Sequence, residues 1–85
     1  MKGHFLSGKE IERFEKYLRE EEKSQNTMEK YVRDVQAFAE YCDGKEIIKE
    51  TVIAYKQNLI DNGYAVKSIN SMLASINSLF SFLGW

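Results

Sequence analysis

The strongest constraint on the fold is an apolar pattern that occurs twice with the same spacing, 41 positions apart. The first set advances by steps of three, one, three, three, one and three residues, and the second set repeats those steps. Such spacing places every member on one stripe of an amphipathic helix. The sequence therefore predicts two long helices that bury equivalent faces. The two sets are Met28, Tyr31, Val32, Val35, Phe38, Ala39 and Cys42, and then Ile69, Met72, Leu73, Ile76, Leu79, Phe80 and Leu83.

The composition supports a small helical domain. The chain has 85 residues, of which 44% are hydrophobic and 29% charged, as in ordinary soluble globular proteins. It contains no proline and five glycines, which suits helices joined by short turns and argues against an all-β fold. We therefore expect a single all-α domain over residues 1–85, built as a compact four-helix bundle.

The residues that most chemistry requires are scarce. One cysteine, Cys42, and one histidine, His4, cannot form an intrachain disulfide or a structural zinc site. His4 precedes the first helix in a segment that we expect to be frayed, and no glycine-rich phosphate loop occurs. We therefore expect no catalytic residue, no metal and no cofactor. No segment is apolar enough to span a bilayer, and the first residues lack the apolar run of a signal peptide, so the cytoplasm is the expected compartment.

Helix signals divide the chain into four elements. Ser7 and Glu10 form a capping box before the first helix, which we expect to fade in the charged run after Leu18. Asn26 and Glu29 form a second such box, so the second helix is expected over residues 27–43.

The other two helices are marked less evenly. The third is expected over residues 50–62, with Thr51 as its only cap-like residue and with Val52, Tyr55, Leu59 and Ile60 on one side. The fourth is expected over residues 66–83. After Lys67 the chain carries no charge, and the positions outside the apolar stripe are mostly small. An uncharged face of this kind indicates close approach by another helix, a second domain or a nucleic acid.

Three stretches resemble the N-terminal core-binding domain of tyrosine recombinases, the SAM-like domain of phage integrases and Xer-type proteins. Residues 24–38 match the family pattern S-x-N-T-hydrophobic-x-x-Y-x-x-D-hydrophobic-x-x-F, through Thr27, Tyr31, Asp34 and Phe38. The other two stretches are residues 15–20, at the end of helix one, and residues 63–70 with the apolar positions that follow them. The resemblance implies a SAM-like orthogonal bundle.

The resemblance also implies a role. In this family the domain is one half of a clamp around duplex DNA, and a separate C-terminal domain carries the arginines, histidines and tyrosine that cut and rejoin strands. We therefore expect a non-catalytic DNA-binding domain of a longer recombinase, with the chain ending where the interdomain linker begins. Expected partners are double-stranded DNA and other recombinase protomers in a synaptic complex, with the isolated domain monomeric and not bound to membranes.

Candidate DNA contacts lie in the second and fourth helices. Helix starts with free N–H groups, hydroxyls and nearby cations bind phosphates, whereas amide side chains can reach base edges or sugars. Relatives often carry arginine or lysine where helix four has asparagine and serine, so we expect weak, largely non-specific binding. The candidates are Thr27, Lys30, Arg33, Lys67, Ser68, Asn70, Ser71 and Asn77.

Two other functions stay open. The net charge of −1 is unusual for a domain that binds nucleic acid by itself. The chain is therefore also interpreted as a helical protein–protein interaction module that uses the uncharged face of helix four. A third hypothesis is a regulator that occupies recombination sites without cutting them.

Overall fold

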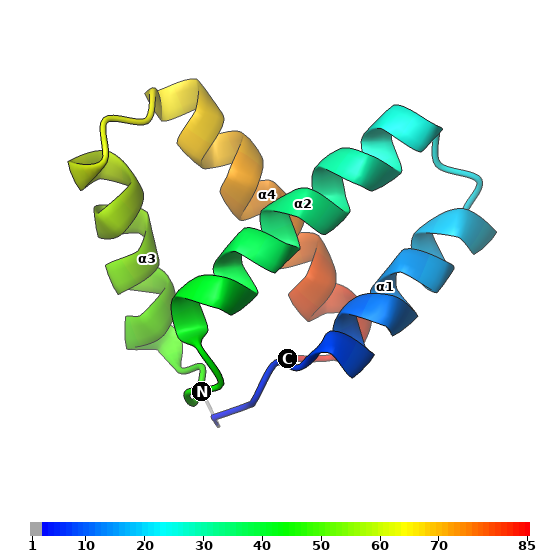
Figure 1. The fold of residues 1–85 in the computed structure, drawn as a ribbon, viewed down its shortest axis with the longest axis horizontal. Helices are drawn as coiled ribbons and strands as arrows, with labels where there is room; N and C mark the ends of the chain where they lie inside the picture. Colours follow the sequence, from blue (N-terminus) through cyan, green and yellow to red (C-terminus); the bar gives the residue numbers. More distant parts are fainter. Residues whose placement is uncertain (1–2) are drawn as a thin grey trace.

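The computed structural model describes residues 3–85, and these residues form four helices (Figure 1). The helices are α1 (Gly8–Glu20), α2 (Gln25–Cys42), α3 (Lys49–Asp61) and α4 (Val66–Leu83). Helices α1 and α2 form one V-shaped hairpin, and α3 and α4 form a second. Helices α2 and α4 cross in the middle of the molecule, with α1 and α3 on the outside. The all-α, four-helix prediction is confirmed.

The two hairpins are repeats of one another with a period of 41 residues. Both outer helices have 13 residues, both crossing helices have 18, and each helix of the second hairpin begins 41 positions after its counterpart. The turns repeat as well, because Lys23 N–H donates to the Leu18 carbonyl at 3.3 Å and Tyr64 N–H donates to the Leu59 carbonyl at 3.2 Å. The periodicity predicted for two helices therefore extends through the whole fold.

The core follows this repeat. Phe14 and Phe38 are fully buried, and their counterparts Tyr55 and Leu79 are 3% and 0% exposed. Phe38 contacts the Tyr55 and Phe80 rings edge-on, with centroids 5.0 and 5.9 Å away. Both predicted apolar stripes face inward, with every member buried or half-buried. The stripe residues that are buried are Met28, Val35, Phe38, Cys42, Ile69, Ile76, Leu79 and Phe80.

The helix starts show one confirmed cap and one wrong prediction. The Glu10 carboxylate accepts hydrogen bonds from both the backbone N–H and the hydroxyl of Ser7, as the capping box predicts. The proposed cap at Asn26 is wrong. The Ser24 hydroxyl instead accepts the Thr27 N–H at 3.2 Å, so α2 begins at Gln25, two residues earlier than expected.

The third helix differs from the prediction in one important detail. It begins at Lys49 with Ile48 as the N-cap residue. Thr51 is the third residue of the helix, where its hydroxyl accepts the Ile48 N–H at 3.1 Å, so Thr51 helps to cap the helix but is not the N-cap itself. Ile60 is 47% exposed, so its placement on the buried side is wrong. Neighbouring residues on a helix point about 100° apart. Because Leu59 points into the core, Ile60 is turned towards the solvent.

The segment before α1 is anchored, which contradicts the expected fraying at His4. His4 and Ile47 exchange two backbone hydrogen bonds, and the His4 ring stacks on Trp85 with centroids 4.5 Å apart. Trp85 in turn packs against Phe80 at 5.7 Å. These contacts bring the two ends of the described chain together at one edge of the molecule (Figure 1).

Candidate nucleic-acid interface

The predicted DNA contacts come from the two crossing helices. Figure 1 shows the first turns of α2 (cyan) and α4 (yellow) at opposite corners of one edge of the molecule, the edge that lies away from the chain termini. Thr27 lies in the first turn of α2, and Lys67 and Ser68 lie in the first turn of α4. This edge therefore presents the N–H groups of two helix starts, which favour anions.

The eight predicted contacts divide by exposure. Asn70 and Asn77 lie on the solvent side of α4 and follow Lys67 at helical spacing, so they form one exposed row. The structure therefore brings five of the residues to the surface and leaves three half-buried. The exposed residues are Arg33, Lys67, Ser68, Asn70 and Asn77, and the half-buried ones are Thr27, Lys30 and Ser71.

Thr27 is engaged at its own helix start. Its hydroxyl accepts a hydrogen bond from the Ser24 hydroxyl at 2.8 Å, and its backbone N–H donates to the same oxygen at 3.2 Å. The pair is an ordinary N-cap arrangement, which satisfies one of the free donors of α2.

Lys30 is held between α2 and α4. Its ammonium donates to the Asp34 carboxylate at 2.5 Å, to the Ser71 carbonyl at 3.3 Å and to the Ser75 hydroxyl at 3.3 Å. Ser75 donates its own proton to the same Asp34 oxygen at 2.8 Å. The exposed fraction of the Lys30 side chain is 35% and that of the Asp34 side chain is 8%.

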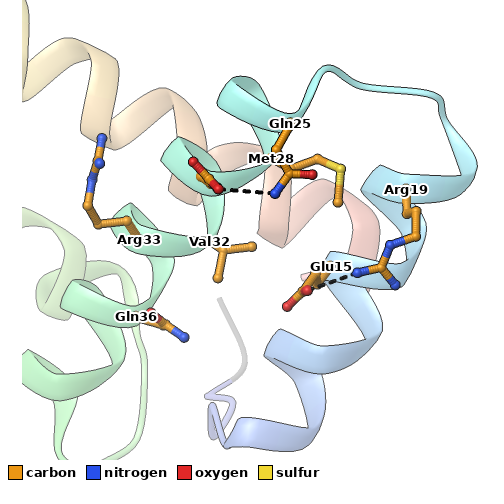
Figure 2. A pocket seen from close by; sticks show the side chains of 8 residues that line it. Glu15, Arg19, Gln25, Met28, Val32, Arg33 and Gln36 are labelled. Carbon is orange, nitrogen blue, oxygen red and sulfur yellow. Dashed lines mark hydrogen bonds and ion pairs between the residues drawn. The ribbon is translucent and has the colours of Figure 1, made fainter.

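Arg33 lies one turn beyond Lys30, beside a shallow groove of about 200 Å³ between α1 and α2 (Figure 2). On the far side of this groove Glu15 and Arg19 form an ion pair at 3.1 Å, and Arg33 extends away from them. Within residues 3–85, neither Arg33 nor Lys67 forms an ion pair. Both cations are therefore available to a ligand on the surface.

Two of the tyrosines have environments unlike that of a nucleophilic phenolate. Burial raises the pKa of Tyr55 to about 12, and a hydrogen bond and the charge of Glu21 raise the pKa of Tyr17. Burial also raises the pKa of the Cys42 thiol. Among the described residues, no three His, Cys, Asp or Glu side chains lie close enough together to hold a metal ion.

The chain matches one known family of protein domains. The model for the phage integrase N-terminal SAM-like domain matches residues 11–85. The chain belongs to this family. The predicted family and the SAM-like fold are therefore confirmed, and a phage integrase SAM-like domain is not itself catalytic. Neither the curated proteins nor the solved structures gave a match to this integrase domain.

Over residues 3–85, no helix of this integrase domain is both long enough and apolar enough to cross a bilayer.

The buried polar pair of this integrase domain, Asp34 and Ser75, was not predicted from the sequence. Asp34 was assigned only as part of the family pattern, and Ser75 is one of the small residues on the uncharged face of the fourth helix. A signal was present, because both residues border the apolar stripes and stand at equivalent positions of the 41-residue repeat. Equivalent residues of two crossing repeats meet where the helices contact.

Proposed function

We propose that this integrase SAM-like domain is the DNA-binding half of a clamp in a site-specific tyrosine recombinase. It would grip duplex DNA at the recombination site while a C-terminal catalytic domain of the same protein cleaves and rejoins the strands. The observation that carries the proposal is the family match over residues 11–85. The exposed cations and amides of α2 and α4 support it.

The proposed contacts differ between the two helices. In α2, Arg33 would neutralise a phosphate and Thr27 would approach the DNA at the helix start, while Lys30, which is held between α2 and α4, is the least exposed of the three predicted cations. In α4, Lys67 would pair with a phosphate beside the Ser68 hydroxyl. Phosphate contacts position a protein on DNA, whereas contacts to base edges can specify sequence. The uncharged residues Asn70, Ser71 and Asn77 would therefore approach bases or sugars.

The charge balance sets the expected strength of binding. Each neutralised phosphate contributes about 0.9 to the slope of log K against log salt. Arg33 and Lys67 are the exposed cations of the proposed face, and the whole chain has a net charge of −1. We therefore expect weak, largely non-specific binding with a shallow salt dependence for the isolated chain.

Fluorescence anisotropy with a labelled duplex of mixed sequence tests this function over a range of salt concentrations. Arg33→Gln and Lys67→Gln should each weaken binding and reduce the slope by about 0.9. Lys45→Gln is the matched control, because Lys45 is exposed after the end of α2, away from the two helix starts. Equal effects of all three variants would refute the proposed face, and sub-micromolar binding at physiological salt would refute the expected weakness.

One observation favours the alternative of a protein–protein interaction module. Ile53 and Ile60 project from the outer side of α3, and the adjoining Tyr64 and Val66 are also exposed, by 49% and 74%. Stable self-association in sedimentation experiments without DNA would favour this alternative. NMR shifts caused by duplex DNA at Thr27, Arg33 and Lys67 would favour the clamp.

The proposal has consequences for partners and location. Recombinases assemble as several protomers on DNA, so contacts with other protomers in a synaptic complex are part of the proposed role, with the isolated domain monomeric. The cytoplasm is the location that we propose for this role. A non-catalytic regulator that occupies recombination sites would use the same DNA-binding face, and only a test of strand cleavage by the whole protein separates these two roles.

A further inference from the structure

The Lys30 ammonium has as many partners as it has protons. Its three N–H groups meet three oxygen atoms, those of the Asp34 carboxylate, the Ser71 carbonyl and the Ser75 hydroxyl. Among the described residues, no buried side-chain nitrogen or oxygen lacks a hydrogen-bond partner. The network is therefore complete within the protein and needs no ligand to satisfy it.

This network lies where the two repeats contact each other. Asp34 and Ser75 occupy equivalent positions of the 41-residue repeat, and so do Lys30 and Ser71. The first hairpin supplies both charges, and the second supplies a hydroxyl and a carbonyl. Ser75 is 0% exposed and Asp34 is 6% exposed, so the carboxylate depends on Lys30 and Ser75 for the partners it has lost from water.

A phosphate on the surface is a poor competitor for this ammonium. Removing one partner of a buried ion pair leaves an uncompensated buried charge, which is strongly unfavourable. An exposed ion pair contributes much less and is weakened further by salt. The Lys30 ammonium is therefore better stabilised by Asp34 than by a phosphate beside α2.

We propose that Asp34 and Ser75 hold the Lys30 ammonium between α2 and α4 as an internal anchor, so that Lys30 positions the two helices and its charge is withheld from DNA. The proposal rests on the proposed DNA-binding function. It makes Lys30 a positioning residue and Asp34 an internal counter-ion that lowers the affinity of this domain for DNA.

The salt dependence of duplex binding distinguishes an anchored lysine from a phosphate contact. In the anisotropy assay with labelled duplex DNA, Lys30→Gln should leave the slope unchanged, whereas the neighbouring Arg33→Gln should reduce it by about 0.9. Asp34→Asn keeps the size of the side chain but removes its charge, and it should raise the slope by about 0.9 because Lys30 becomes free. A reduction of the slope by Lys30→Gln equal to that by Arg33→Gln would overturn the proposal.

A double variant separates release of Lys30 from a general change in net charge. Asp34→Asn combined with Lys30→Gln should return the slope to that of the unchanged protein, since no lysine is left to be released. A slope that stays raised in the double variant would show that Asp34 acts through the overall field, and this result would also overturn the anchor.

The stability of the variants tests the anchor even where DNA binding fails. The melting-temperature losses of Lys30→Gln and Asp34→Asn should exceed, when added, the loss in the double variant, because each single change breaks the same pair. Additive losses would overturn the anchor. Absence of any duplex binding by the unchanged protein, together with no effect of Arg33→Gln, would instead refute the proposed function.

A further measurement uses the unchanged protein and so does not depend on variants that fold. In ¹⁵N NMR spectra of the lysine ammonium groups, the protons of Lys30 should exchange with water more slowly than those of exposed lysines such as Lys45 and Lys67. Equally fast exchange at all three would contradict the anchor.

Discussion

Replacement of Glu22 by glycine should stabilise this domain. Glu22 follows α1 with a φ of 57°, and its counterpart in the second hairpin is Gly63 with a φ of 83°. The left-handed conformation costs a residue with a Cβ atom roughly 1–2 kcal/mol, and glycine avoids this strain. Glycine also loses about 0.5–1 kcal/mol more conformational entropy on folding, so the net gain expected from Glu22→Gly is about 1 kcal/mol.

Thermal unfolding followed by circular dichroism measures this gain. For a domain of this size, about 1 kcal/mol raises the melting temperature by roughly 4–8 °C. Glu22→Gln is the control for charge. Removing an acidic group near a helix C-terminus helps slightly, but the strained backbone stays. Gly63→Ala should lower the melting temperature, because it introduces a Cβ atom at the same point of the other turn. If Glu22→Gly melts no higher than Glu22→Gln, backbone strain at this turn is not a significant cost.

Three further predictions concern the core. Phe38→Ala should cost about 3–5 kcal/mol in a urea unfolding experiment, a large share of the roughly 4–13 kcal/mol expected for a domain of this length. Phe5→Ala is the control, since Phe5 is 61% exposed, and equal losses would refute the assigned packing. The folded pKa of Tyr55, about 12, exceeds its ordinary value of 10.0, so its contribution to stability is complete below pH 10 and is lost as the pH rises towards 12. Ultraviolet titration should show a phenol ionising near pH 12, and Tyr55→Phe should remove that step. Burial raises the pKa of the Cys42 thiol, so alkylation near neutral pH should be slow in the folded protein and fast in urea; fast alkylation of the folded form would contradict this burial.

The sequence predicted the parts of the fold that periodicity and capping determine. The apolar stripes of α2 and α4 identified the buried faces, because seven apolar positions at helical spacing leave one direction for burial. Competing local signals were harder to resolve. Ser24 and Asn26 are both good cap residues, and the choice between them depends on which one reaches the backbone in three dimensions.

The candidate site was predictable only in part. Residue type and helical spacing located Arg33 and Lys67 on the exposed sides of their helices. The sequence could not show that the Lys30 ammonium turns inward, because this depends on acceptors in α4 that lie 41 and 45 positions away. The role of Asp34 follows only from the crossing of the two helices. The sequence offers many possible partners for a carboxylate on α2, and the structure shows that its partners are Lys30 and Ser75.

The repeated scaffold carries two different surfaces, and this difference bears on function. The hairpins share buried positions and backbone turns, so the packing of the fold is nearly symmetric. Their outer surfaces differ, because α2 carries charged residues where α4 carries asparagine, serine and alanine. If DNA lies across both helix starts, α2 supplies charge and α4 supplies hydrogen-bonding groups. The anchor at Lys30 would then fix the position of α2 relative to α4. That position determines whether the charges of α2 and the hydrogen-bonding groups of α4 can contact the same DNA.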